Sequence, residues 1–270
     1  MPIDIHAIPV FCINLDKRPE RFKKFSGQTG EKALLTNIQR FPAIDGATID
    51  PLKSDKISLQ TKYNILHKTR RSHGEINTLG AIGCSLSHYG VWQKFLEGKA
   101  DYCLVLEDDA DVPVDLREQV MACTGGTYAF DVWALSYRLR GSLRELVGPW
   151  KVPEYYWGTS AYIISRAGAE TLSKSFFPVE CHMDKFFCLQ SELGYIRLVV
   201  HESINMWTLS YGSDVQMYKC DLCDFPDKMD GYMAVDRSAL YIGTGVATAA
   251  VVAAAAILSI FLLRTTIKHE

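Results

Sequence analysis

The sequence reads Tyr102-Cys-Leu-Val-Leu-Glu-Asp-Asp-Ala-Asp111 at its most informative point. The first five residues form an apolar run that predicts a buried strand, and carboxylates follow at positions 107, 108, 109 and 111. In open α/β sheets, ligands bind outside the carboxyl ends of the strands. We therefore expect a binding site where this strand ends.

Four carboxylates packed this closely raise the free energy of the fold unless a cation or hydrogen-bond donors neutralise them. Oxygen ligands at this density suit Mg²⁺ or Mn²⁺, which commonly also hold a substrate's phosphates. A solvated acidic turn is one alternative. Another is an aspartyl-phosphate phosphatase with Asp109 as nucleophile. Against that alternative, Pro113 replaces the expected Thr or Val, and we find no later Lys and paired-Asp motif.

Around this stretch, strand-like and helix-like segments alternate. We expect strands at 8–15, near 41, and at 102–106, 130–136, 155–165 and 195–200. We expect helices from Pro19 onward and at 80–97, 114–123, 167–175 and 184–193, with a long loop at 50–78. This alternation predicts an α/β domain with a mostly parallel sheet that helices cover on both faces.

Composition excludes several classes of protein. The chain has 270 residues, which suits one large domain or one domain with an appendage. Its 29 basic and 31 acidic residues give a net charge of −2, which argues against a nucleic-acid partner held by a broad basic field. With 48% hydrophobic residues a large core can form, and eight cysteines are too few for a disulfide-built mini-fold.

The C-terminal region predicts one transmembrane helix. Residues 240–263 include no charged side chain, and 24 helical residues would span about 36 Å, enough to cross a bilayer. An Ala-rich core helix is the alternative, which Arg264 and Lys268 just beyond the segment make less suitable. The N-terminus lacks the pattern of a signal peptide, so we expect a tail-anchored protein with its globular part in the cytosol.

Six segments, taken in order, resemble glycosyltransferase family 25, which includes lipooligosaccharide and collagen galactosyltransferases. They are INLDKRPER at 13–21, FPAIDG at 41–46, GAIGCSLSH at 80–88, LVLEDD at 104–109, GTSAYIIS at 158–165 and Met183-Asp184. The resemblance implies a GT-A-like fold with a mostly parallel mixed sheet over 1–215. The expected remainder is a stalk at 216–239, the membrane helix at 240–263 and a tail at 264–270.

The resemblance also implies a nucleotide-sugar donor, typically UDP-galactose, and a divalent metal such as Mn²⁺ or Mg²⁺. It makes Asp109 the principal metal ligand and Asp111 a further candidate, with Glu107 or Asp108 nearer the ribose. The other expected donor-binding residues are Asn14, Asp16, Arg21, Asp45, Gly46, Gly83, Ser87 and His88. For some of them a plain turn, a solvated helical turn or a structural histidine remains an alternative.

An inverting transfer needs a base that takes the proton of the acceptor hydroxyl. The resemblance implies Asp184 for this role, and an N-cap aspartate is an equally open interpretation. His201 and Asp214 are further candidates for a metal or acceptor ligand. The aromatic residues at 150 and 155–157 suit either the core or an acceptor sugar. Cys220-x-x-Cys223 lacks two further zinc ligands at defined spacing.

The sequence therefore predicts a membrane-anchored, metal-dependent transferase of a hexose, with galactose the favoured sugar. Its acceptor would be a glycan, as in lipopolysaccharide biosynthesis, a glycolipid or a protein. Alternatives are a catalytically inactive relative that keeps the fold as a binding module, and the phosphatase.

Overall fold

The computed structural model describes residues 2–31, 35, 37–126, 129–206, 208 and 215. The strands are β1 (Val10–Asn14), β2 (Ile38–Pro42), β3 (Tyr102–Glu107), β4 (Val132–Ala134), β5 (Arg138–Leu139), β6 (Leu143–Val147), β7 (Trp150–Pro153), β8 (Tyr156–Trp157), β9 (Ala161–Ser165) and β10 (Leu198–His201). The helices are α1 (Pro19–Glu31), α2 (Leu59–His67), α3 (Leu79–Leu96), α4 (Leu116–Thr124), α5 (Arg166–Ser175) and α6 (Met183–Glu192), with a short 3₁₀ turn η1 (Gly46–Thr48).

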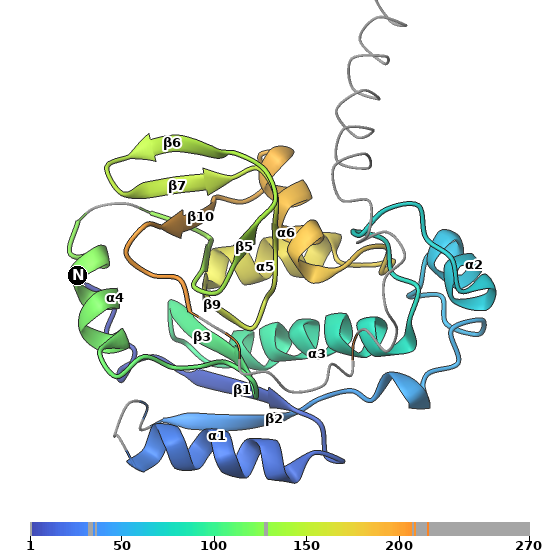
Figure 1. The fold of residues 1–270 in the computed structure, drawn as a ribbon, viewed down its shortest axis with the longest axis horizontal. Coiled ribbons are helices and arrows are strands. Elements are labelled where there is room, and N and C mark those ends of the chain that lie inside the picture. Colours follow the sequence, from blue (N-terminus) through green and yellow to red (C-terminus); the bar gives the residue numbers. More distant parts are fainter. Residues whose placement is uncertain are drawn as a thin grey trace, which may run out of the picture. The chain divides into compact units, whose positions relative to one another are not determined.

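One large mixed sheet organises the described part of the chain (Figure 1). Its strand order is β2-β1-β3-β9-β4-β10-β7-β6, and β5 pairs with β8 in a separate ribbon. The pairings leave β9 and β7 running against the other strands of the large sheet. The predicted α/β class with a mostly parallel mixed sheet is confirmed.

The sheet separates two hydrophobic cores. Cys103 and Val105 of β3 pack with residues of α3, α5 and α6, whereas Leu104 and Leu106 pack with residues of α1 and α4. Both sets are almost fully buried, as expected for a central strand covered on both faces. Burial of each aliphatic side chain among them stabilises the fold by about 1.5–3 kcal/mol. This packing on both faces holds β3 in place, and with it the acids that follow the strand.

Helix α2 lies inside the segment that we expected to be a loop, so that expectation was wrong. Ser58 caps the helix by accepting a hydrogen bond from Thr61 N, and Lys68 ends it in the left-handed region at φ 50°. The buried face is polar: Thr61 bonds the carbonyl of Glu180, and Asn64 bonds Glu75. A helix whose buried residues are polar shows no apolar periodicity.

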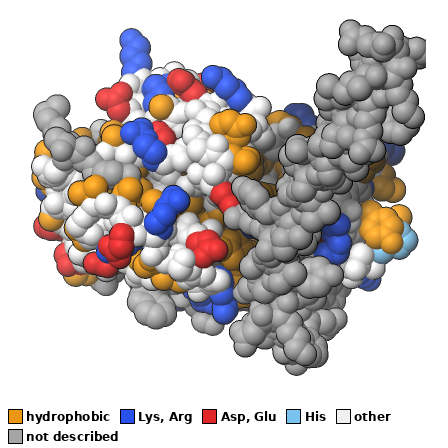
Figure 2. Space-filling view, turned by 90° about the horizontal axis from the view of Figure 1, so that it is seen from above, with side chains coloured by type: hydrophobic (Ala, Val, Ile, Leu, Met, Phe, Trp, Pro, Cys, Tyr) orange, Lys and Arg blue, Asp and Glu red, His pale blue; other side chains and the backbone are white. Residues whose placement is uncertain are grey.

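Charged side chains of both signs are interspersed on the face shown in Figure 2. This mixture agrees with the formal net charge of −2. The described side chains on that face therefore form no broad basic field of the kind that attracts nucleic acid.

The predicted stalk, membrane helix and tail lie outside the described residues, as do Asp214, Cys220 and Cys223. Within the part that the structure describes, no helix is both long and apolar enough to cross a membrane.

Candidate functional site

A pocket opens where β1 and β3 end side by side. The two strands pair in parallel with Ile13 opposite Glu107, so the residues that follow each strand meet at one edge of the sheet. Eight predicted site residues line the pocket: Asn14, Arg21, Asp45, Gly46, Ser87, Glu107, Asp108 and Asp109. The structure therefore gathers most of the predicted donor-binding residues in one place.

Five other predicted residues do not line this pocket: Asp16, Gly83, His88, Asp111 and Asp184. The Asp16 side chain is 77% exposed and pairs with Arg40 Nη2 at 2.6 Å. Asp111 is exposed beyond the end of β3. His88 and Gly83 belong to α3 and lie behind residues of the lining, as described below.

Asp108 is held in place by the end of β1. It is 8% exposed, and its Oδ2 accepts a hydrogen bond of 2.6 Å from Asn14 Nδ2. Arg21 Nη1 lies 3.9 Å from the other oxygen, Oδ1. Asn14 is itself buried, donates to the carbonyl of Arg18 and accepts from Arg40 Nε at 2.8 Å. Because these partners use its polar atoms, Asn14 acts here by positioning Asp108.

Asp109 is the least compensated acid at the site. Its Oδ1 is buried and has no hydrogen-bond partner. The pKa of Asp109 is raised to about 7, mainly by burial and then by the charges of Glu107 and Asp108, while Arg21 opposes the shift. A carboxylate with one buried oxygen beside two other acids needs a counter-charge. The donor set and the unpartnered oxygen fit a hard divalent cation.

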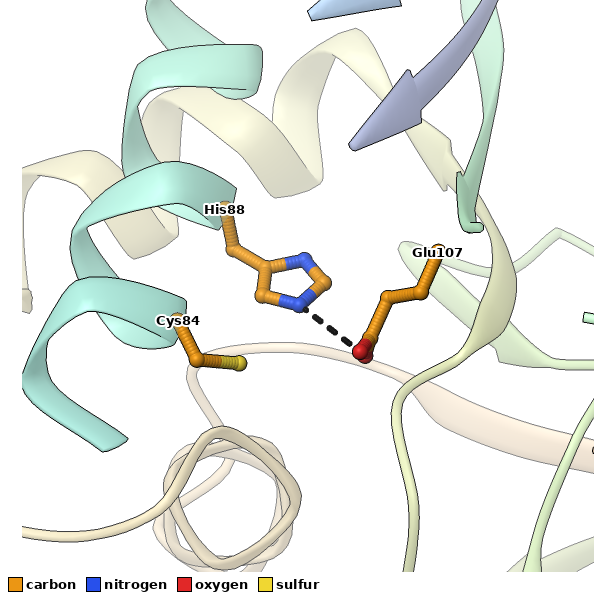
Figure 3. Close-up of side chains that lie close together, drawn as sticks. All are labelled: Cys84, His88 and Glu107. Atoms are coloured by element: carbon orange, nitrogen blue, oxygen red, sulfur yellow. Dashed lines mark ion pairs between the residues drawn. The ribbon is translucent and has the colours of Figure 1, made fainter. Parts of the chain in front are cut away.

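Glu107, Asp108 and Asp109 form the acid group of the pocket. Glu107 connects this group to α3 and to the segment before β9. Its Oε1 accepts a 3.2 Å hydrogen bond from Thr159 Oγ1, and its backbone N–H donates to the carbonyl of Ser160. The Nε2 atom of the fully buried His88 lies 3.4 Å from the same Oε1 (Figure 3). The expected donor-pocket residue His88 therefore touches the acid group from inside the protein.

Two glycines allow the turn after β2 to pack tightly on α3. A Cβ on Gly83 would lie 2.5 Å from the carbonyl oxygen of Ile44 and 2.7 Å from the nitrogen of Gly46. A Cβ on Gly46 would lie 1.9 Å from the carbonyl oxygen of Leu79. Ser87 Oγ also accepts a hydrogen bond from Ile44 N at 2.8 Å. Gly83 and Ser87 thus fix the wall of the pocket through its backbone.

Asp45 both caps a turn and borders the pocket. Its Oδ1 accepts from Ala47 N at 3.0 Å, which caps η1. Its Oδ2 pairs with Lys17 Nζ at 2.7 Å, and this ammonium lowers the pKa of Asp45. Lys17 also lines the pocket, so it adds a second basic side chain beside Arg21.

Asp184 is not the N-cap residue of its helix, so the N-cap interpretation was wrong in position, although its carboxylate does accept from an N–H of the first turn. His182 is the N-cap residue of α6, and Asp184 lies one residue inside the helix. Its carboxylate accepts hydrogen bonds from Gly158 N at 3.0 Å and Lys185 N at 2.7 Å. The pKa of Cys84 is raised by burial and then by the charges of Glu107, Asp184 and Asp109. The charge of Asp184 therefore acts on Cys84, a residue of the pocket lining that is also close to Glu107 and Asp109.

The remaining candidates are His201 and the aromatic residues at 150 and 155–157, most of which pack against other side chains of the fold. The His201 ring lies edge-on against Trp150 at 4.7 Å between centroids, and its Nδ1 accepts from Ser203 N. Trp150 and Tyr156 belong to the buried cores. Trp157 is partly exposed and lies under the Arg140 guanidinium, 3.7 Å from the ring centroid. Tyr155 and Trp157 are both partly exposed, whereas Trp150 and Tyr156 are buried.

Sequence reasoning assigned no role to Arg40, Lys17, Cys84 or Thr159. Arg40 reaches Asn14 because β1 and β2 pair in the register Cys12 to Arg40, which sequence does not reveal. Cys84 had a usable signal, since it precedes His88 by four residues on a predicted helix and so shares its face. Thr159 lies in a segment used only to recognise the family.

Known proteins with related sequences are glycosyltransferases. The chain is 31% identical over 172 residues to a glycosyltransferase 25 family member of Aedes aegypti, covering 60% of this chain and 27% of that protein. It is 27% identical over 174 residues to human procollagen galactosyltransferase 2, again covering 60% of this chain and 27% of the relative. The chain thus matches about a quarter of the length of these relatives.

One solved structure with partial similarity to this chain is that of a glycosyltransferase involved in the glycosylation of the major capsid of PBCV-1. The match covers 83% of this chain and 98% of that chain, with a TM-score of 0.40 and 11% sequence identity. Similarity at this level adds nothing to the assignment.

The model of glycosyltransferase family 25, described as an LPS biosynthesis protein, matches residues 7–145. That range is more than half of the chain, and it contains β1, α3, β3 and the four acids that line the pocket. The chain belongs to glycosyltransferase family 25.

Proposed function

We propose that this chain transfers galactose from UDP-galactose to a hydroxyl group of a protein, glycan or glycolipid acceptor, with the help of a divalent cation. The family and the procollagen galactosyltransferases among its relatives support the reaction type and the sugar. The observation that carries the proposal is the buried, unpartnered Asp109 oxygen beside Glu107 and Asp108.

Some pocket residues would bind the cation, and others would bind the diphosphate of the donor. Asp109 would hold the cation, and Arg21 and Lys17 supply positive charge at the same pocket. A bound divalent cation supplies the charge that offsets the negative charge growing on the leaving diphosphate. Asn14 and Arg40 keep Asp108 oriented, so it does not have to reorganise when the donor binds.

Asp184 is the residue we assign to the acceptor hydroxyl. As the acceptor oxygen bonds to the anomeric carbon, the bond from that carbon to UDP breaks, and a carboxylate takes the hydroxyl proton. The hydrogen bond from Gly158 N fixes the orientation of the Asp184 carboxylate. Attack from the face opposite UDP makes the transfer inverting.

Donor binding gives the direct test. Wild-type protein should show a rise in Tm with Mn²⁺ and UDP-galactose together, because a ligand that binds the folded state stabilises it by mass action. Asp109→Asn should lose this rise, whereas Asp111→Asn, which changes an exposed acid outside the pocket, should retain it. Equal responses in wild type and Asp109→Asn would refute the proposal.

Two alternatives are distinguished from the proposal by assays of turnover. A catalytically inactive relative would bind the donor but neither hydrolyse UDP-galactose nor transfer the sugar. A phosphatase would release inorganic phosphate from a phosphomonoester, with Asp109 as nucleophile. The family match supports neither of these, and parallel assays for UDP and phosphate release separate all three.

We also propose that residues 240–263 anchor the protein in a membrane as a single helix, with the globular part on the cytosolic side. The support is the uncharged stretch of 24 residues in the sequence. An anchor of this kind would hold the pocket near a lipid-linked or membrane-bound acceptor.

A further inference from the structure

The side chains of Cys84 and His88 from α3 and of Glu107 from β3 point toward one another (Figure 3). Cys84 and His88 are one turn apart on α3, so they share a face, and Glu107 is the last residue of β3. One ligand atom from each, a sulfur, a ring nitrogen and a carboxylate oxygen, lies within 4.8 Å of the other two. We propose that these three residues form a transition-metal site suited to Zn²⁺, distinct from the oxygen ligands at Asp109.

The contact between His88 and Glu107 is poorly explained as a hydrogen bond. His88 Nε2 is buried and has no hydrogen-bond partner, although Glu107 Oε1 lies 3.4 Å away. Ordinary N–H···O bonds are about 2.7–3.2 Å long. Two ligands held about 2.0–2.1 Å from a tetrahedral zinc ion lie about 3.3–3.4 Å apart. The observed separation fits two ligands of one cation.

The second ring nitrogen of His88 is already held by the protein. Its Nδ1 lies 3.0 Å from the Tyr162 hydroxyl, which also accepts a 2.9 Å hydrogen bond from Trp92 Nε1. Metal-binding histidines usually donate their other ring N–H to a partner that fixes the tautomer and the ring orientation. With Nδ1–H directed at Tyr162, the Nε2 lone pair faces Glu107 and Cys84.

The donor set selects the class of metal. A thiolate and an imidazole favour Zn²⁺ over Mg²⁺ or Mn²⁺, which prefer carboxylates, carbonyls and water. Three protein ligands leave the fourth tetrahedral position open, as in zinc sites that hold a water molecule or a substrate atom. Binding requires the three ligand atoms, which lie within 4.8 Å of one another, to draw together around the ion. It also requires Cys84 to lose its proton, which burial and the nearby acids oppose until a cation is present.

Cobalt spectroscopy tests this site without measuring transfer. Titration of the purified full chain with Co²⁺ should produce a near-ultraviolet thiolate-to-cobalt charge-transfer band, and added Zn²⁺ should displace it at about one ion per chain. Cys84→Ser should abolish the band. His88→Gln should weaken Zn²⁺ affinity by at least about tenfold, and Tyr162→Phe by a similar factor through loss of the orienting contact.

Matched controls separate this site from the fold and from donor binding. Cys188→Ser changes a buried cysteine of α6 that lies outside the proposed ligand set and should keep the band. Asp109→Asn should lose Mn²⁺-dependent binding of UDP-galactose but also keep the band, so failure of either proposal can be recognised. Circular dichroism checks that each variant is folded. Folded wild-type protein without the band, or a band that persists in Cys84→Ser, would overturn the zinc site.

Discussion

At the scale of single residues, the chemistry rests on how Asp108 and Asp109 differ. Asp108 receives the Asn14 amide and faces Arg21, whereas the buried oxygen of Asp109 receives no hydrogen bond. Adjacent carboxylates can therefore have separate tasks, one fixed as part of the scaffold and one open to a cation. Desolvation and like charges raise the pKa of Asp109, and a divalent cation would reverse that shift.

Replacement of Asp184 by Asn should separate chemistry from donor binding. Asn keeps the size of the side chain and an oxygen that can accept from Gly158 N, but it cannot take a proton at neutral pH. We expect kcat for galactosyl transfer to fall about 10²–10⁴-fold. The dissociation constant for UDP-galactose, measured by calorimetry, should change little. Glu180→Gln is the matched control, since Glu180 is exposed and near in sequence; a comparable loss there would contradict the assignment to Asp184.

Asp131 gives a prediction of pH-dependent stability. Although burial raises its pKa, hydrogen bonds from the side chain and backbone of Arg197 lower it overall. A carboxyl with a lowered folded pKa contributes stability above its unfolded pKa, and this is lost as pH falls through the folded value. Asp131→Asn should lower the free energy of unfolding by about 1–2 kcal/mol at pH 7. In urea titrations the difference from wild type should shrink below about pH 4; a constant difference would exclude this ion pair as its cause.

At the scale of elements, the pocket depends on close contact between α3 and the turn after β2. In Gly83→Ala the new Cβ would meet backbone atoms of Ile44 and Gly46, which cannot rotate away. We expect a loss of about 1–3 kcal/mol in stability, together with weaker donor binding because the pocket wall moves.

Gly27→Ala is the control for that substitution. Gly27 lies within α1 and has nothing within 4 Å of the position a Cβ would take. Alanine there should stabilise the protein by about 0.5–1 kcal/mol and leave donor binding unchanged. Thermal denaturation of the two variants side by side checks both signs. If Gly83→Ala were as stable as wild type, the tight packing of this turn on α3 would be wrong.

The sequence predicted those elements whose burial follows a simple pattern. The apolar run before Glu107 indicated β3 and its end, and Pro19 indicated the start of α1. Helix α2 was missed because Thr61 and Asn64, its buried residues, are polar. The β6–β7 hairpin was missed because most of β6 is exposed and therefore lacks an apolar signal.

In the candidate site, too, the sequence predicted some residues and missed others. Motif residues such as Arg21 and Asp109 were expected at the pocket and line it. Arg40 and Thr159 reach the site only through strand register and the approach of β9 to β3, which depend on the folded chain. Cys84 and His88 were one turn apart on a predicted helix, but the third partner, Glu107, comes from a different element.

At the scale of the whole molecule, the prediction concerns attachment to a membrane. Introducing arginine at Val251 and Ala254 places two charges in the middle of the uncharged stretch. Each charge disfavours insertion by about 2.5–3.5 kcal/mol. The full chain carrying both changes should move from the membrane fraction to the soluble fraction on flotation with liposomes. The variant with leucine at both positions is the control and should stay with the lipid; identical behaviour of the two would contradict an anchor at 240–263.

The most direct measurement is a crystal of the full chain soaked with Mn²⁺ and UDP, with data collected near the manganese absorption edge. We predict an anomalous peak about 2.0–2.3 Å from a carboxylate oxygen of Asp109, in contact with the diphosphate of UDP. Diphosphate bound elsewhere, or a pocket without the peak and with Asp108 and Asp109 turned into solvent, would contradict the proposed role of this corner of the sheet.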